Sequence, residues 1–151
     1  MLQRRNPAND HLIVNINGRL LPRDEAGVSP FDSSVQNGDA VWEGLRLYDG
    51  RIFRLGAHLA RLHKSAAMLA YAGVPTEATL VAELARTLAA NQMHDGVHVR
   101  LTVSRGLKYT SGLDPRINQS GCSFFILAEH KPPVFDNTHG IRLVTARQRR
   151  P

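Results

Sequence analysis

The fold is decided by residues 40–72, which read AVWEGLRLYDGRIFRLGAHLARLHKSAAMLAYA. Val41, Leu45 and Leu47 alternate with polar or aromatic residues, and this alternation indicates a half-buried strand. Asp49-Gly50 follows, a dipeptide that takes the positive φ angles of a tight hairpin turn at low cost. The first half of the stretch therefore predicts a β-hairpin, and the second half a helix.

Two helices are expected to pack against the sheet. The first, over residues 57–72, has apolar residues spaced by three or four positions, which places them on one helical face. They are Leu59, Leu62, Ala66 and Leu69. Gly73 and Pro75 indicate its end, and Thr76 is suited to cap the second helix. The expected buried stripe of the second helix is Leu80, Val81, Leu84 and Leu88.

Strands are predicted on both sides of this central region. Asn17-Gly18 lies between two apolar runs and predicts a hairpin over residues 12–21. Alternation over 97–103 predicts a strand with Arg100 on the face opposite its valines, and the apolar run 122–128 predicts a central strand. The pattern is that of an α+β domain, an antiparallel sheet with two packed helices.

Two further segments bear on domain organisation. The loop over residues 105–121 is rich in Gly, Pro, Ser and Asn, and a loop of this length is typically functional or disordered. Residues 141–145 read as a fresh strand near the end of the chain. We assign residues 1–133 to a small N-terminal domain, and 134–151 to an interdomain segment with the first strand of a large domain.

Composition excludes several classes of protein. The 151 residues carry a net charge of +6, but the basic residues are scattered and form no stripe interleaved with aromatic residues, so nucleic-acid binding is not expected. No apolar run approaches the roughly 20 residues of a membrane helix, and no secretory signal follows the first residues. The single cysteine, Cys122, fits a reducing compartment. We expect a cytoplasmic protein without a metal site.

Four ordered stretches carry a resemblance to a known family. They are residues 17–32 (NGRLLPRDEAGVSPFD), 38–48 (GDAVWEGLRLY), 53–66 (FRLGAHLARLHKSA) and 97–106 (VHVRLTVSRG). Their order and spacing resemble the class IV (fold type IV) aminotransferases, which use pyridoxal 5'-phosphate (PLP) and include the branched-chain and D-amino-acid enzymes. The resemblance covers nearly the whole chain and implies the small N-terminal domain of such an enzyme.

The resemblance implies that Arg61 binds the PLP phosphate. Arg61 borders the apolar stripe of its helix, where a charge needs a partner, and a phosphate dianion is a strong one. From the residues alone, a solvated helix arginine is the favoured interpretation of Arg61, and it is the resemblance that favours phosphate binding instead. His58, in the same motif, is expected to be a structural hydrogen-bonding residue. We expect Arg61 to lie on the same side of the sheet as Gly44 and Arg100.

The resemblance also implies a set of substrate-binding residues. They are Asn37, Trp42, Gly44, Arg46, Arg100 and Leu113. Asn37 stands where many branched-chain enzymes have tyrosine, and Trp42 where the family has phenylalanine or tyrosine, so the substrate amino acid and its enantiomer stay open. The alternatives are core packing for Trp42, a cross-strand ion pair for Glu43, a solvent-exposed Arg100 and a mobile surface loop around Leu113.

The family's cofactor-binding lysine has no counterpart among Lys64, Lys108 and Lys131, and is expected beyond Pro151. No residue of this chain is therefore expected to be catalytic. The resemblance implies an aminotransferase acting on an amino acid, with branched-chain the first choice, and a 2-oxo acid. It also implies a homodimer whose loop tip reaches the partner's site. The alternatives are a lyase of the aminodeoxychorismate-lyase type on the same fold, and a non-catalytic stand-alone binding domain.

Overall fold

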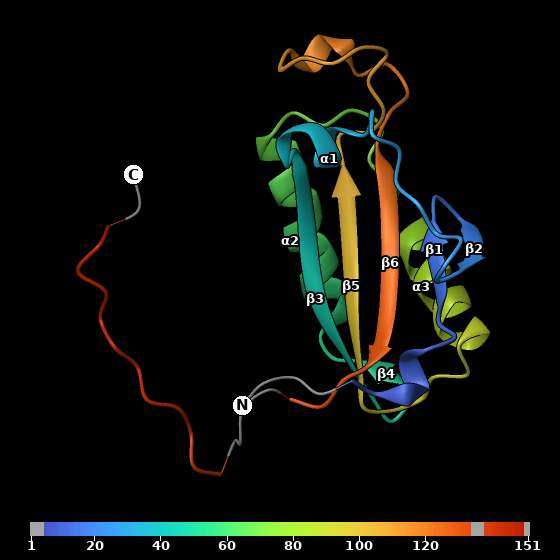
Figure 1. Cartoon of the computed structure of the whole chain (residues 1–151), viewed down its shortest axis with the longest axis vertical. Helices are drawn as coiled ribbons and strands as arrows, with labels where there is room; N and C mark the ends of the chain where they lie inside the picture. The colour runs from blue at the N-terminus through green and yellow to red at the C-terminus, as the bar shows by residue number, and fades with distance from the viewer. Residues whose placement is uncertain (1–4, 134–137, 150–151) are drawn as a thin grey trace.

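Six strands form one antiparallel sheet in the computed structural model, which describes residues 5–133 and 138–149. The strands are β1 (Ile13–Ile16), β2 (Arg19–Pro22), β3 (Ala40–Tyr48), β4 (Arg51–Ile52), β5 (Val97–Ser104) and β6 (Ser123–His130). Their order across the sheet is β2-β1-β6-β5-β3-β4, and each neighbouring pair is antiparallel (Figure 1). The predicted α+β class is confirmed.

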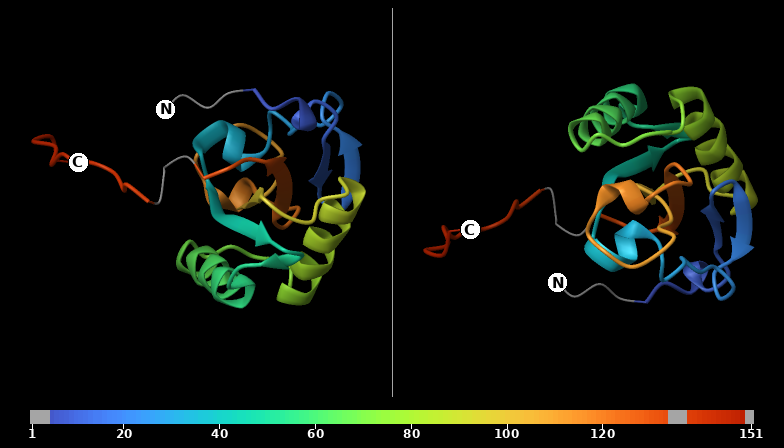
Figure 2. Two further views of the ribbon diagram at one scale, coloured as in Figure 1. Left: turned by 90° about the horizontal axis from the view of Figure 1, so that it is seen from below. Right: turned by 90° about the horizontal axis from the view of Figure 1, so that it is seen from above.

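Two long helices, α2 (Leu55–Met68) and α3 (Glu77–Ala90), lie on one face of this sheet. Figure 2, viewed along the strands, shows both helices on the same side of the curved sheet. A short helix, α1 (Ser33–Asn37), and two 3-10 turns (Pro7–Asn9 and Pro115–Ile117) complete the elements. Within the described ranges, no helix combines the length and the apolar character that crossing a membrane requires.

Strand alternation divides the central sheet into two faces. One face packs on α2 and α3 through fully buried side chains, among them Leu45, Val99, Leu101, Val103 and Ile126. The other, which we call the open face, carries three cross-strand rows on β3, β5 and β6. These rows are Trp42–Thr102–Phe125, Gly44–Arg100–Leu127 and Arg46–His98–Glu129. In the described part of the chain, no helix covers them (Figure 1).

The local signals for turns and caps are confirmed. Asn17 and Gly18 have φ angles of 52° and 80°, as a type I′ hairpin turn requires. Asp49 and Gly50, at 43° and 73°, turn the chain between β3 and β4 in the same way. Thr76 caps α3, because its hydroxyl oxygen accepts a hydrogen bond from the Thr79 backbone N–H at 3.1 Å.

Two residues expected in the core are exposed. Leu69 is 46% exposed because α2 ends at Met68 and the chain turns at Ala70, which has a φ of 53°. Val81 is 43% exposed, and the buried stripe of α3 continues through Thr87 instead. The Thr87 hydroxyl is satisfied by donating to the Glu83 carbonyl and accepting from Asn15, so burial of this polar residue is tolerated.

The strand predicted over residues 141–145 does not form. Every described residue from 138 to 149 is exposed, and none belongs to a strand. A strand is stable only when its backbone N–H and C=O groups pair with a neighbour, and no described residue offers that pairing here. Residues 134–137, in the predicted interdomain segment, and 150–151 lie outside the described residues. The division at residue 133 stays a prediction.

Candidate cofactor and substrate site

A buried carboxylate anchors Arg61. Glu43 is 5% exposed and shares a cross-strand row with the fully buried Leu101 and Ile126, so its charge lies on the apolar face of the sheet. Arg61 Nε donates to Glu43 Oε1 at 2.7 Å and Arg61 Nη2 donates to Oε2 at 2.5 Å. His58 Nδ1 lies 2.8 Å from the same Oε2. The two helix side chains together satisfy the buried charge.

The pairing shifts the titration of this carboxyl group. The hydrogen bond from Arg61, opposed by burial and assisted by His58, holds the pKa of Glu43 below its usual 4.5. A carboxyl whose folded pKa is depressed stabilises the fold above its unfolded pKa, and that contribution is lost as the pH falls through the folded value.

We therefore expect Glu43→Gln to remove part of the acid sensitivity of the fold. The free energy of unfolding of wild type should exceed that of the variant at pH 7, and the difference should shrink as the pH falls from about 5 to about 3. Urea titrations of both proteins across this range measure the difference, and other carboxyl groups cancel in the comparison. A difference that stays constant down to pH 3 contradicts the assignment.

The opposite edge of the Arg61 guanidinium faces outward. The side chain is 64% exposed, and Nη1 makes no hydrogen bond to any described residue. Glu43 therefore fixes one edge of the group and leaves the other free for an anion. A fixed guanidinium with a free edge suits a phosphate, because it binds through charge-assisted hydrogen bonds without first having to be ordered.

The expectation that Arg61 lies on the same side of the sheet as Gly44 and Arg100 is wrong. Helix α2 covers the face toward which Glu43 points, whereas Gly44, the next residue of β3, belongs to the open face. Strand β4 pairs only with Leu47 and Tyr48, so the outer edge of β3 before these residues has no strand neighbour among the described residues. No hydrogen bond or ring contact among the described residues joins Arg61 to Gly44 or Arg100.

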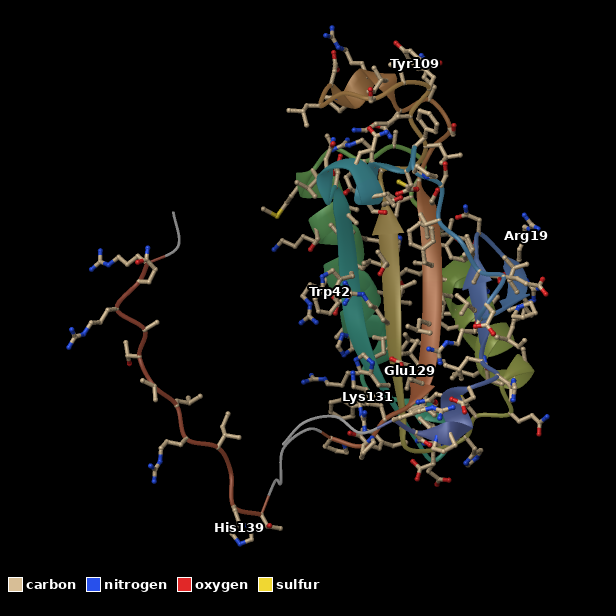
Figure 3. The ribbon with its side chains drawn as sticks, viewed as in Figure 1. Arg19, Trp42, Tyr109, Glu129, Lys131 and His139 are labelled. Atoms are coloured by element: carbon tan, nitrogen blue, oxygen red, sulfur yellow. The ribbon has the colours of Figure 1, made fainter. Side chains whose placement is uncertain are left out.

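On the open face the structure brings three of the predicted substrate residues together. The Arg100 guanidinium carbon lies 4.1 Å from the centroid of the Trp42 ring, and Gly44 pairs with Arg100 across the strands. Trp42 is 54% exposed, which excludes core packing (Figure 3). Arg46 occupies the next row, where its Nη1 donates to the Lys131 carbonyl oxygen at 2.6 Å, and it is therefore engaged.

The remaining two predicted residues lie near the long loop at one end of the sheet (Figure 1). Lys108 is 4% exposed and its Nζ donates to the Gly112 carbonyl at 2.6 Å. In the orientation that satisfies both groups, the Asn37 side-chain oxygen accepts from the same Nζ at 2.5 Å. Leu113, beside Gly112, is 83% exposed. No hydrogen bond or ring contact among the described residues joins Asn37 or Leu113 to Trp42 or Arg100.

Two ion pairs of this region, between Glu43 and Arg61 and between Asp39 and Arg105, were not anticipated. Glu43 stands in the alternation of Val41, Leu45 and Leu47, and this was the available signal that it faces inward. Arg105, the first residue of the long loop, donates to Asp39 at 2.6 Å and to two backbone carbonyls at the end of α2. Tyr71 donates to the same Asp39 at 2.7 Å, and burial raises its pKa above the ordinary value of 10. The contacts of Arg105 and Tyr71 with Asp39 join residues far apart in the chain, so no local sequence pattern predicts them.

Comparisons with known proteins identify the family of the chain. Residues 40–151 match the model of the family described as amino-transferase class IV. The chain is 50% identical over 144 residues to branched-chain-amino-acid aminotransferase-like protein 2 of Arabidopsis thaliana, covering 95% of this chain and 26% of that protein.

Two solved structures share its fold. A branched-chain aminotransferase from Thermoproteus uzoniensis superimposes with a TM-score of 0.66 at 25% identity, over 79% of this chain and 40% of that one. A 4-amino-4-deoxychorismate lyase from Pseudomonas aeruginosa superimposes with a TM-score of 0.67 at 27% identity, over 84% and 43%. The chain thus spans about a quarter to less than half of the proteins it matches. It belongs to the class IV aminotransferase family and has the fold of the family's N-terminal domain.

Proposed function

We propose that the chain is the N-terminal part of a PLP-dependent aminotransferase that moves an amino group between a branched-chain amino acid and a 2-oxo acid. The observation that carries the proposal is Arg61, which Glu43 holds by one edge while Nη1 stays free. This geometry fits a phosphate group. The names of the similar proteins support branched-chain substrates.

The residues of this chain would bind and orient rather than react. Arg61 would hold the cofactor phosphate, and Trp42, Gly44 and Arg100 would line the substrate side of the site. PLP, when bound, supplies the electron sink on which amino-group transfer depends. The cofactor-binding lysine of the family is expected beyond Pro151, so the 151 residues alone should not turn over substrate. Lys108 is an unsuitable substitute because its amine is occupied by Gly112 and Asn37.

The proposal extends to assembly and location. The exposed Leu113 at the loop tip is where the family resemblance implies a contact with the partner subunit, so we propose a homodimer. We further propose a cytoplasmic protein that binds neither nucleic acid nor membranes, and a domain boundary near residue 133. Asn37 and Arg46 are secondary substrate candidates, since each is already held by a neighbouring group.

Trp42 provides the test, because it is the single tryptophan of the chain and lies on the open face. Pyridoxamine 5'-phosphate, which lacks the aldehyde that reacts with surface lysines, should quench its fluorescence saturably. Pyridoxamine, without the phosphate, should bind at least about tenfold more weakly. The chain should show no transfer from leucine to 2-oxoglutarate. A folded chain that binds both compounds equally, or neither, overturns the proposal.

A second candidate is supported by the likeness to the lyase of Pseudomonas aeruginosa. A lyase on this fold would use the same cofactor site, so the two functions differ in the reaction and not in Arg61. Loss of 4-amino-4-deoxychorismate, with no amino transfer, in the complete polypeptide would favour it. The stand-alone binding domain is the third alternative, and phosphate-dependent cofactor binding would exclude it.

Gly44→Ala should separate binding from folding. An added Cβ would lie 3.4 Å from His98 Nε2 and 3.7 Å from Trp42 Cζ3, which are ordinary contacts, so the free energy of unfolding should change by no more than about 1 kcal/mol. The methyl group would nevertheless fill the space over the strand and weaken 4-methyl-2-oxopentanoate binding by about tenfold. Urea unfolding and Trp42 fluorescence measure the two effects. Unchanged affinity would argue that the ligand does not lie over Gly44.

A further inference from the structure

His58 lies one helical turn before Arg61 on α2 and contacts the same carboxylate. Residues three apart share a face of a helix, and α2 packs beside β3, the strand that carries Glu43 (Figure 1). Glu43 Oε1 accepts a hydrogen bond from Arg61 Nε, whereas Oε2 faces both Arg61 Nη2 and His58 Nδ1. Glu43, His58 and Arg61 therefore form one cluster, which we call the carboxylate cluster.

The geometry of the carboxylate cluster places a hydrogen atom on His58 Nδ1. This nitrogen lies 2.8 Å from Glu43 Oε2 and 3.2 Å from Arg61 Nη2. An ionised carboxylate only accepts hydrogen bonds, and a guanidinium only donates them. A bare Nδ1 would bring two lone pairs within 2.8 Å of each other. Nδ1 therefore carries the hydrogen and donates it to Oε2.

The protein holds the three members of the carboxylate cluster with different firmness. The side chain of Glu43 is 6% exposed, that of His58 is 19% exposed and that of Arg61 is 64% exposed. The last side-chain torsion of a glutamate has a broad minimum, so an exposed arginine by itself leaves carboxylate and guanidinium free to turn together. His58 is mostly enclosed and has only two side-chain torsions. Its hydrogen bond to Oε2 therefore opposes this joint rotation.

We propose that His58 is a positioning residue for anion binding, which fixes the Glu43 carboxylate and thereby keeps the Arg61 edge that carries Nη1 turned outward. The inference rests on the proposed function, in which the anion is the cofactor phosphate. A guanidinium that is already oriented binds a phosphate without the cost of ordering its side chain. Loss of the Nδ1–H donor should therefore weaken phosphate binding even though Arg61 and Glu43 are both unchanged.

Two substitutions separate this hydrogen bond from the bulk of the ring. In His58→Asn the amide nitrogen can take the place of Nδ1, whereas His58→Leu has no donor. In the chain without ligand, nitrogen-15 NMR measures the rotation of the Arg61 guanidinium about its Nε–Cζ bond. Loss of the hydrogen bond should make this rotation at least about fivefold faster in His58→Leu than in wild type. In His58→Asn the rate should stay within about twofold of wild type.

Affinity for pyridoxamine 5'-phosphate, measured by tryptophan fluorescence, should follow the same order. His58→Leu should weaken it at least about threefold and His58→Asn by no more than about twofold, with pyridoxamine affinity unchanged in both. His63→Leu is the matched control on the same helix. The ring nitrogens of His63 lie 2.9 Å from the carbonyl oxygens of Leu59 and Pro75. Because His63 contacts neither Glu43 nor Arg61 through these bonds, its loss should leave the guanidinium rotation unaltered.

A purely structural histidine would give different results. Rotation that is equal in His58→Leu and wild type, or equally fast in His58→Leu and His63→Leu, overturns the inference. So does a wild-type spectrum in which His58 Nδ1 carries no hydrogen, and this measurement requires no variant to fold. Wild type that does not bind pyridoxamine 5'-phosphate would count against the proposed function, whereas the rotation in the ligand-free chain decides whether His58 positions Arg61.

Discussion

Arg61→Ala should lower the affinity for pyridoxamine 5'-phosphate at least about tenfold, which corresponds to the loss of a charge-assisted hydrogen bond to the phosphate. Affinity for pyridoxamine should stay unchanged, because that compound offers no phosphate. Quenching of Trp42 fluorescence measures both. Arg86→Ala is the matched control, since Arg86 also extends from a helix and pairs with a glutamate, Glu83, at 2.6 Å. It should leave both affinities unaltered.

The same substitution also leaves the buried Glu43 with His58 as its only remaining side-chain partner among residues 5–133 and 138–149. An uncompensated buried carboxylate destabilises a fold, so weaker binding could reflect damage rather than a lost contact. The double variant Arg61→Ala/Glu43→Gln separates these effects, because a neutral glutamine needs no counter-charge. Its urea midpoint should exceed that of Arg61→Ala, while its phosphate-dependent affinity stays low. Recovery of affinity in the double variant would contradict a phosphate role for Arg61.

Gly106→Ala should destabilise the domain more than any other single change considered. A Cβ at this position would lie 1.8 Å from the carbonyl oxygen of Gly121 and 2.9 Å from its carbonyl carbon, and backbone atoms cannot move aside locally. The φ of +103° adds strain for an L-residue. We expect a loss of about 3 kcal/mol, the sum of backbone strain and forced repacking.

Urea unfolding measures this loss, and Gly27→Ala is the control. Gly27 has no atom within 4 Å of an added Cβ, and its φ lies outside the left-handed range. Gly106 also accepts hydrogen bonds from Ser33 N at 3.0 Å and from Asn118 Nδ2 at 2.9 Å, so displacing it should loosen the start of the long loop. Equal urea midpoints for the two variants would show that the loop tolerates the shift.

Elements whose signals are local could be predicted from the sequence. Asn17-Gly18 and Asp49-Gly50 form turns because their conformational preference is intrinsic to those residues. Thr76 caps α3 for the same reason. Residues 141–145 have an apolar pattern as well but form no strand in the structure, because pairing depends on a neighbouring strand that a local pattern cannot supply.

The site was predicted less completely, because its geometry depends on pairs far apart in the chain. The family motif pointed to Arg61, but only the structure shows that Glu43, 18 residues earlier, fixes its orientation. The buried amine of Lys108 is likewise satisfied by the Gly112 carbonyl and by Asn37, and no periodicity in the sequence predicts these contacts.

The most direct measurement observes Arg61 itself. In nitrogen-15 NMR of the chain, the Arg61 Nε–H resonance should shift saturably as pyridoxamine 5'-phosphate is added, with the dissociation constant given by Trp42 fluorescence, and should stay in place when pyridoxamine is added. An Arg61 Nε–H resonance that does not shift with pyridoxamine 5'-phosphate, or that shifts equally with pyridoxamine 5'-phosphate and pyridoxamine, would contradict phosphate binding by this guanidinium.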